Sequence, residues 1–372
     1  MINKKLRVAL VHDYIKEFGG AERVLRVLAD MFPEAPIYTA FVKQGSSAAE
    51  EFQDREIIQW KHAWLIKHKN MHSPLRFLIP NIWESFDFSD YDLVISSASG
   101  YITKGIITSA RTLHVCYCHT PPRFLYGYNT PSDWRRSGLV RLYGEMLIGR
   151  LRKYDYWAAQ RPDILVANSK EVKRRISKFY RRDAQVIYPP VEVEKLYKMS
   201  SDLKKKNYYL IVARLVGTKG LELALEAQRK MGFDLKIVGE SVGREWQGRE
   251  NGDGVEWLGR VSDEELVKLY GEARAFLALA QDEDFGMTVV EAMASGTGVV
   301  AYKGGGYKET VIDGKTGVLF EEYSMEGLVG AIEKFGKIKI KRSDCYGQAK
   351  KFAKEKFEEE ILEVIDKGLR DM

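Results

Sequence analysis

The sequence predicts an α/β protein made of two doubly wound domains, each a parallel sheet with helices on both faces. Short β-branched apolar runs alternate along the chain with loops and amphipathic helical patterns, which is typical of βαβ units. The chain has 372 residues, more than one ordinary domain of about 100 to 200 residues holds. An apolar content of 45% is sufficient for two packed cores.

The first domain is predicted over residues 1–190. Its first strand is expected at 6–11, and the loop that follows passes Gly19 and Gly20 into a helix near 21–31. Further strands of this domain are predicted at 92–96, 112–118, 163–167 and 185–188.

The domain boundary is predicted at Pro189 and Pro190, because consecutive prolines cannot continue a helix or a central strand. A Lys-rich linker is expected at 191–206, and the second domain at 207–350. Its strands are predicted at 208–213, 235–238, 275–280 and 298–302, and the last segment, 351–372, is a helix that could return to the first domain.

One helix start in the second domain can be argued locally. Ser262 and Glu265 form a capping-box pattern, which places Gly259, Arg260 and Val261 in the loop just before a helix. In open α/β sheets, loops at the carboxyl ends of strands carry ligands, so the search for chemistry narrows to such loops.

Charge and composition exclude several classes of protein. A net charge of +6 is less basic than expected of a dedicated nucleic-acid binder. Three cysteines cannot form a fully paired disulfide framework, so we expect a reducing, cytoplasmic setting. The apolar run after Arg7 is too short for a secretory signal, and no run of about eighteen apolar residues could span a membrane.

The most informative segment is 281–296, which follows a buried-looking strand and opens a helix. Unpaired N–H groups in the first turn of a helix suit a phosphate. Glu283 lies in the loop and Glu291 about two turns later, so the two carboxylates could bind separate hydroxyl-bearing parts of one elongated ligand. A charged surface loop before an ordinary helix is the alternative explanation.

Two cations follow the first strand of the second domain. Arg214 and Lys219 lie on a turn with Gly217 and Gly220 that leads into a helix, where they could stabilise a diphosphate as a leaving group. Such a pair alone is more often solvated surface. Because this loop and the loop with Glu283 belong to one sheet edge, we expect one phosphate-bearing ligand to meet both.

A histidine and a pair of glycines are the candidates in the first domain. His119 ends a strand, where it suits a ligand contact or a proton transfer, although an ordinary polar strand end explains it as well. Gly19 and Gly20 could let a ligand approach the backbone, and a tight turn into the helix is the alternative.

Cofactor patterns are absent or weak. The nicotinamide fingerprint Gly-x-Gly-x-x-Gly does not occur after the first strand, so hydride transfer is disfavoured. Asp282 and Asp284 match a two-residue pattern that can hold Mg²⁺ or Mn²⁺ through diphosphate oxygens. Chance produces this match often, and Arg214 and Lys219 already supply positive charge, so we expect no metal and no required cofactor.

Together these motifs resemble the retaining glycosyltransferases of family 4, which have the GT-B fold of two Rossmann-like domains facing a central cleft. The resemblance runs from Arg7 to about Phe320. It rests on Gly19-Gly20, 118–121, Asn168-Ser169, 187–191, Arg214 with Lys219, 259–261, and Glu283 with Phe285-Gly286 and Glu291. Within the family, segments 91–97, 117–121 and 292–297 are most similar to mannosyltransferases of O-antigen and other surface-polysaccharide assembly.

The resemblance implies catalytic roles for four residues. Arg214 and Lys219 would hold the donor's diphosphate. Glu283 would bind the hydroxyls of the transferred sugar, and His119 would contact that sugar from the opposite domain.

The resemblance also implies a set of residues that only bind the donor. Glu291 would hold the ribose, and the loop at Arg260 and Val261 would meet the base. Backbone donors would come from Phe285, Gly286 and Met287, while Gly19 and Gly20 would line the cleft.

The implied substrates are a nucleotide sugar and a glycan or polyprenyl-diphosphate-linked acceptor. GDP-mannose is the favoured donor, and a UDP-sugar is the alternative. Segments 60–69 and 170–182 are rich in cations, the first with aromatic residues among them, and could rest on an anionic membrane leaflet. Two solvated helix faces explain them equally well. We therefore expect a cytoplasmic protein that could lie at the inner face of the membrane, with no nucleic-acid partner.

Two rival functions stay open at this point. One is another reaction of the same fold, such as a UDP-glucose or UDP-N-acetylglucosamine transferase or a nucleotide-sugar 2-epimerase. The other is a basic RNA-binding protein, whose affinity for RNA would fall steeply with salt. Donor binding that survives salt and depends on Lys219 would favour the transferase.

Overall fold

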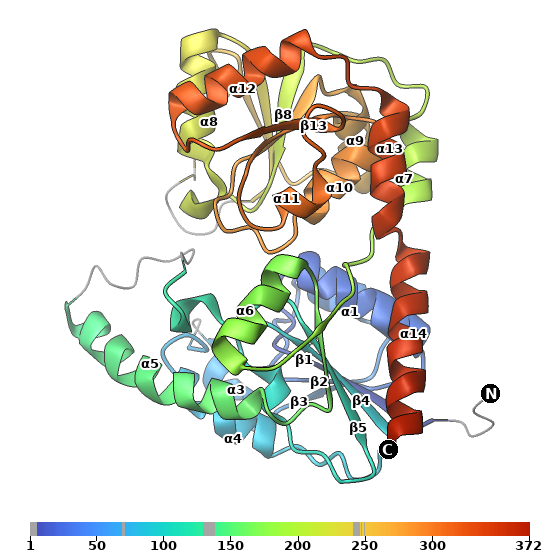
Figure 1. Cartoon of the computed structure of the whole chain (residues 1–372). Coiled ribbons are helices and arrows are strands. Elements are labelled where there is room, and N and C mark those ends of the chain that lie inside the picture. The colour runs from blue at the N-terminus through green and yellow to red at the C-terminus, as the bar shows by residue number, and fades with distance from the viewer. Residues whose placement is uncertain (1–5, 69–70, 129–137, 241–245, 247, 249) are drawn as a thin grey trace. The chain divides into compact units, whose positions relative to one another are not determined.

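The computed structural model describes residues 6–68, 71–128, 138–240, 246, 248 and 250–372. The chain divides into two compact units, and each contains a parallel sheet covered by helices (Figure 1). The first unit comprises Met1–Pro190 and Phe357–Met372, and the second comprises Val191–Lys356.

The first unit is built on a seven-stranded parallel sheet among its described residues, in the order β3-β2-β1-β4-β5-β6-β7. Its strands are β1 (Val8–His12), β2 (Ile37–Thr39), β3 (Ile57–Gln59), β4 (Leu93–Ala98), β5 (Leu113–Cys118), β6 (Ile164–Ala167) and β7 (Gln185–Val186). Its helices are α1 (Gly20–Met31), α2 (Ser47–Glu51), α3 (Ala63–Lys67), α4 (Ile79–Glu84), α5 (Gly138–Ala158), α6 (Lys170–Tyr180) and α14 (Lys354–Asp371). The central strands β1, β4 and β5 are buried along their whole length, as expected for parallel strands covered on both faces.

Helices α1 and α14 share an apolar core with the first sheet. Leu25 and Leu28 of α1 and Ile361 and Ile365 of α14 belong to one buried cluster that includes residues of β1, β4 and β5. The helical spacing of these apolar residues explains both helices, because one face of each is removed from water. Figure 1 shows the red C-terminal helix α14 beside the sheet that contains the N-terminal strands.

The second unit contains a six-stranded parallel sheet among its described residues, in the order β10-β9-β8-β11-β12-β13. Its strands are β8 (Tyr208–Val212), β9 (Asp234–Val238), β10 (Val255–Gly259), β11 (Ala275–Ala278), β12 (Val299–Tyr302) and β13 (Gly317–Phe320). Its helices are α7 (Val193–Ser200), α8 (Leu221–Met231), α9 (Asp263–Glu272), α10 (Met287–Ala294), α11 (Tyr307–Thr310), α12 (Met325–Lys337) and α13 (Arg342–Ala349). Ser262 caps α9 by accepting a hydrogen bond from the N–H of Glu265 at 3.2 Å, as predicted.

The structure differs from the sequence predictions in three places. Residues 191–206, predicted as a linker, contain helix α7, and its Val193 is buried within the second unit. Gly259, predicted in a loop, is the last residue of β10. Strands β2, β3, β10 and β13 were not predicted; β2 and β3 have only three residues, too few to show a periodicity.

Each sheet has one point at which the strand order reverses direction. In the first sheet this point lies between β1 and β4, and in the second it lies between β8 and β11. In open α/β sheets, ligands bind at the carboxyl ends of the strands beside such a point. The two reversal points therefore locate the candidate site residues of each unit.

Candidate active site

The second unit carries the predicted cations and acidic residues at its reversal point. Arg214 and Lys219 lie in the loop after β8, and Lys219 ends a 3₁₀ turn that precedes α8. Glu283 lies in the loop between β11 and α10. Because β8 and β11 pair in parallel, the two loops leave the sheet at the same edge.

Lys219 and Glu283 are in direct contact. Nζ of Lys219 lies 2.6 Å from Oε2 of Glu283, with the side chains 23% and 18% exposed. The hydroxyl of Tyr307 donates to the same Oε2 at 3.4 Å. Burial, followed by the nearby Glu283 carboxylate, raises the pKa of Tyr307 well above its usual value, so the hydroxyl stays protonated and remains a donor. A ligand that reaches this pair meets a cation and a carboxylate side by side.

Helix α10 begins in the loop that holds Glu283. Its N-cap, Gly286, has a φ of 93°, and a Cβ at this position would come 2.7 Å from Cε1 of Tyr307. Both the backbone conformation and the lack of space therefore require glycine. The buried Phe285 ring contacts the ring of Phe352 with centroids 5.3 Å apart, which anchors the loop. The first turn of α10, from Met287 onward, carries backbone N–H groups that favour an anion.

Two further predicted contacts of the donor lie on other elements than Lys219 and Glu283. Glu291 is only 4% exposed, and its Oε2 accepts a hydrogen bond from the hydroxyl of Tyr270 in α9 at 2.8 Å. Arg260 and Val261 follow the edge strand β10, and Arg260 is exposed. In the described part of the chain, no hydrogen bond or ion pair joins Arg260 to Lys219, Glu283 or Glu291.

Sequence reasoning missed the loop that supports Glu283 from behind. The backbone N–H of Gly306 donates to the carbonyl of Glu283 at 2.8 Å. A Cβ on Gly305 would come 2.0 Å from the same carbonyl oxygen, so only glycine permits this approach. Three consecutive glycines, 304–306, which begin one residue after strand β12, are the signal that could have identified this loop and the adjoining Tyr307.

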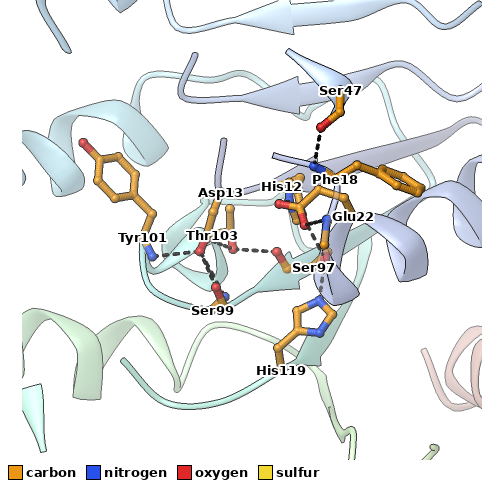
Figure 2. A network of polar contacts seen from close by, with 11 residues as sticks. His12, Asp13, Phe18, Glu22, Ser47, Ser97, Ser99, Tyr101, Thr103 and His119 are labelled. Carbon is orange, nitrogen blue, oxygen red and sulfur yellow. Dashed lines mark hydrogen bonds and ion pairs between the residues drawn. The ribbon is translucent and has the colours of Figure 1, made fainter. Parts of the chain in front are cut away.

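In the first unit, three strands each bring one polar side chain to the reversal point (Figure 2). His12 ends β1, Ser97 lies on β4 opposite His12 in the register, and His119 follows β5. Oγ of Ser97 lies 3.0 Å from Nδ1 of His12 and 2.8 Å from Nε2 of His119. Of these three residues, sequence reasoning selected only His119.

Glu22 extends this network to the predicted glycine pair. Its Oε1 lies 3.4 Å from Nε2 of His12, and its Oε2 accepts a hydrogen bond from the N–H of Gly19 at 3.0 Å. Gly19 is the N-cap of α1, and Gly20 is the first residue of the helix. A Cβ on Gly19 would lie 3.2 Å from Oε2 of Glu22, so glycine leaves room for the carboxylate. The network thus connects both predicted parts of the first unit, the glycine pair and His119.

His119 is nearly enclosed, with 8% of its surface exposed. Burial lowers the pKa of His119 to about 3, because a charged imidazole would lose its hydration there. The ring is therefore neutral at neutral pH. A neutral imidazole can hold and orient a hydroxyl group through a hydrogen bond.

Asp13 fixes the loop beside this network. Its Oδ2 accepts hydrogen bonds from the N–H groups of Ser99 and Tyr101, at 3.2 and 2.8 Å, and its Oδ1 accepts from the hydroxyl of Thr103 at 2.9 Å. Ile102 has a φ of 60°, a left-handed conformation that is costly for a β-branched residue. Asp13 therefore holds both neighbours of a strained residue in place.

Two kinds of feature are absent from the described residues. No three or more His, Cys, Asp or Glu side chains come together there as a metal site would need. None of the helices in that part of the chain combines the length and apolar character required to cross a membrane.

Two family models match the chain and together extend over residues 18–352. The model described as Glycosyltransferase Family 4 matches 18–195, and the one described as Glycosyl transferases group 1 matches 193–352. An uncharacterized glycosyltransferase of Methanocaldococcus jannaschii is 30% identical over 46% of this chain and 49% of its own length. Glycogen synthase of Thermus thermophilus is 39% identical over 32% of this chain and 29% of its own length. The chain thus spans about half, or less, of these two curated relatives.

Other relatives match nearly the whole chain at lower identity. The GDP-Man:Man(3)GlcNAc(2)-PP-Dol alpha-1,2-mannosyltransferase of Caenorhabditis elegans is 26% identical over 99% of this chain and 85% of its own length. Sucrose-phosphate synthase from Thermosynechococcus elongatus has a TM-score of 0.75 at 16% identity and covers 99% of this chain and 100% of its own. Anabaena HepE in complex with UDP-glucose has a TM-score of 0.68 at 19% identity and covers 98% and 100%. These two structures establish the fold.

Proposed function

Because this chain belongs to the glycosyltransferases with the GT-B fold, we propose that it transfers a hexose from a nucleotide-sugar donor to a glycan or lipid-linked sugar, with retention of the anomeric configuration. The observation that carries the proposal is the Lys219–Glu283 pair in the loop that opens α10. Mannose from GDP-mannose is the preferred donor, and surface-polysaccharide assembly is the preferred role. The mannosyltransferase relative, which matches 99% of this chain, supports the choice of donor.

In the proposed reaction, the bond between the anomeric carbon and the diphosphate breaks, and the acceptor oxygen bonds to the same face of that carbon. The proton of the acceptor hydroxyl passes to the departing diphosphate oxygen, on which negative charge grows. Lys219, Arg214 and the N-terminus of α10 would stabilise that charge more strongly in the transition state than in the bound donor. This route needs no covalent enzyme intermediate, no metal and no further cofactor.

The donor would replace the contact between Lys219 and Glu283. At 2.6 Å the two side chains satisfy each other in the free protein. A diphosphate is the better partner for the ammonium group, and sugar hydroxyls are donors that a carboxylate accepts. Because the pair is partly solvated, this exchange costs little. The donor would therefore bind to Lys219 and Glu283 without leaving either charge buried and unpaired.

The same proposal assigns the remaining residues to the donor's other parts. Glu291 would accept hydrogen bonds from the ribose hydroxyls, with Tyr270 fixing the orientation of the carboxylate. Arg260 and Val261 would meet the base. His119 would contact the transferred sugar, and Gly19 and Gly20 would lie near the diphosphate and the acceptor.

We infer that a lipid-linked acceptor reaches the first unit from an anionic membrane surface. Helix α5 exposes Leu142, Met146, Lys153 and Trp157, which recur at helical spacing. Trp64 of α3 is 63% exposed and borders a pocket of about 620 Å³ that Val42, Lys43, Gln44, Leu65, Lys67, His68 and Met71 also line. Apolar side chains interleaved with cations are typical of surfaces that bind anionic headgroups.

The second basic segment, 170–182, is less suited to this role. Arg175 is buried, with Nε 3.2 Å from Oε1 of Glu171, and Arg182 donates to the carbonyl of Pro162 at 2.9 Å. These cations stabilise the unit internally, so α5 and α3 are the better candidates. Lys69 of the first basic segment lies outside the described residues.

A donor screen tests the proposed reaction. The protein is incubated separately with GDP-mannose, UDP-glucose and UDP-N-acetylglucosamine, and the melting temperature and the products are measured. A true donor stabilises the folded protein by mass action, and we expect this for GDP-mannose. If only a UDP-sugar raised the melting temperature, the donor would be a UDP-sugar and not GDP-mannose. Anabaena HepE was solved in complex with UDP-glucose. A free epimer formed without any acceptor would overturn the transferase proposal.

Vesicle sedimentation tests the membrane contact. We expect binding to vesicles that contain anionic lipid and loss of binding in the variant Leu142→Glu with Trp157→Glu. Leu362→Glu is the matched control, because Leu362 is an exposed leucine on α14 outside the proposed surface. Equal binding by the double variant and the control would contradict the proposed surface.

A further inference from the structure

Glu22, His12, Ser97 and His119 form a chain of hydrogen bonds in the first unit. The positions of the atoms determine which member of each bond is the donor. The hydroxyl of Ser97 lies between two imidazole rings, 3.0 Å from Nδ1 of His12 and 2.8 Å from Nε2 of His119 (Figure 2). One hydroxyl proton can be donated to only one ring, so the other ring must donate to the oxygen. A neutral imidazole likewise has one N–H and one bare nitrogen. The tautomers of His12 and His119 are therefore coupled.

Glu22 selects between the two possible directions. Burial raises the pKa of Glu22, but hydrogen bonds from His12 and from the backbone N–H of Gly19 outweigh burial and lower this pKa below its usual value. The carboxylate is thus ionised and can only accept hydrogen bonds. In a neutral ring of His12, the single proton must then lie on Nε2, 3.4 Å from Oε1 of Glu22.

The remaining protons follow from this choice. Nδ1 of His12 is bare and accepts the hydrogen bond from Ser97. The oxygen of Ser97 then accepts from Nε2–H of His119, which leaves Nδ1 of His119 without a proton. In the part of the chain that the structure describes, Nδ1 of His119 forms no hydrogen bond with another residue.

We propose that Glu22 fixes the tautomer of His119 through His12 and Ser97, so that His119 presents Nδ1 to a ligand as a hydrogen-bond acceptor. His12, Ser97 and Glu22 are then positioning residues, which act on a ligand only through His119. The group that Nδ1 accepts from is a hydroxyl; that it belongs to the transferred sugar rests on the proposed function. The same carboxylate accepts the hydrogen bond from the N–H of Gly19, so the tautomer of His119 also depends on the position of the N-cap of α1.

The isosteric variant Glu22→Gln gives the sharpest test. The N–H of Gly19 still needs an acceptor, so the amide oxygen of Gln at position 22 would face Gly19 and its NH₂ group would face His12. Nε2 of His12 would then have to be bare, and every hydrogen bond in the chain would reverse. His119 would carry its proton on Nδ1 and present a donor instead of an acceptor.

The measurement is ¹⁵N NMR of histidine-labelled protein without ligand near pH 8, where protonated and bare ring nitrogens have well separated chemical shifts. Signals are assigned from the variants His12→Asn and His119→Asn. We expect Nε2–H in both rings of the wild type, Nδ1–H in both rings of Glu22→Gln, and loss of this coupling in Ser97→Ala. Ser96→Ala is the matched control, because Ser96 forms the same kind of bond, 2.8 Å to Nε2 of His114, outside the network.

Two results would overturn the proposal: His119 protonated on Nδ1 in the wild type, or a tautomer of His119 that Glu22→Gln leaves unchanged. A kinetic readout separates this proposal from the proposed function. We expect kcat/KM for the donor to fall about threefold in Ser97→Ala, less than in His119→Ala, and to stay unchanged in Ser96→Ala. If the tautomers reverse in Glu22→Gln while no variant alters transfer, the tautomer coupling stands and the assignment of His119 to the sugar is wrong.

Discussion

The two points at which the strand order reverses hold their polar side chains by different interactions. In the second unit, Lys219 and Glu283 form a partly exposed ion pair at 2.6 Å. In the first unit, His12, Ser97 and His119 are buried and joined by directional hydrogen bonds. A solvated ion pair opens at low cost and can exchange its partner for a ligand, whereas a buried polar network keeps one arrangement. Under the proposed function, the second unit would supply charge and the first unit would supply orientation.

The largest expected effect is a loss of stability of the first unit in acid. Burial lowers the pKa of both His114 and His119 to about 3, compared with about 6.5 in an unfolded chain. The unfolded chain therefore binds protons that the folded unit excludes, so stability that is complete above pH 6.5 is lost as the pH falls toward 3. At pH 5 the loss is about 2 kcal/mol for each of the two histidines.

Hydrogen exchange resolved by peptide can measure this loss separately in each unit. All six histidines precede residue 120, so the second unit contains none. Protection should fall within 6–190 between pH 7 and pH 5 and change less within 207–350. Burial also lowers the pKa of the partly buried His72 to about 4, so the variant His114→Phe should remove between a third and a half of the pH dependence. Equal losses in both units would contradict the assignment to these histidines.

The next largest effect is expected from removing the charges of the second unit. Lys219→Ala and Glu283→Ala should each lower turnover by more than about tenfold, or about 1.4 kcal/mol of barrier, because each removes a direct contact with the donor. Steady-state kinetics with a saturating donor measures the change. Lys303→Ala is the matched control, because Lys303 forms an exposed pair with Glu321 at 2.5 Å in the same unit. Wild-type turnover in both site variants would show that the site is wrongly assigned.

Removing the oriented contact of the first unit should have a smaller effect. His119→Ala should lower turnover about fivefold, because one positioning hydrogen bond is lost while the stabilisation of the leaving group remains. Circular dichroism confirms that the variant is folded. A loss as large as that of Lys219→Ala would give His119 a direct part in the chemistry and would break the contrast between the units.

The smallest effect concerns the residue that orients Glu291. Tyr270→Phe removes the 2.8 Å hydrogen bond to Oε2 of Glu291 and should raise the donor's KM about threefold with kcat unchanged. Tyr208→Phe is the control, because its hydroxyl donates to the carbonyl of Leu269 at 2.8 Å in the same unit. Equal effects of the two variants would argue that Glu291 does not bind the ribose.

Local patterns predicted most of the long elements of the fold. The strands around 6–11, 92–96 and 112–118 and the helix near 21–31 lie within about two residues of their observed bounds. Strands β2 and β3 were missed, because a run of three residues shows no alternation, and β10 and β13 were missed as well. The helix within 191–206 was missed because the Lys-rich composition of the segment outweighed the spacing of Val193 and its neighbours.

The sequence alone determined which residue types stand at the carboxyl ends of the strands: the cations at 214 and 219, the carboxylate at 283, the glycine at 286 and the histidine at 119. Only the tertiary structure decided which of them touch. Lys219 meets Glu283, and Ser97 joins His12 to His119, because β11 lies beside β8 and β4 lies between β1 and β5. Strand order depends on how whole layers bury their apolar faces, so it cannot be predicted from a short run of residues. The direction of each buried hydrogen bond is likewise decided by neighbours that are distant in the sequence.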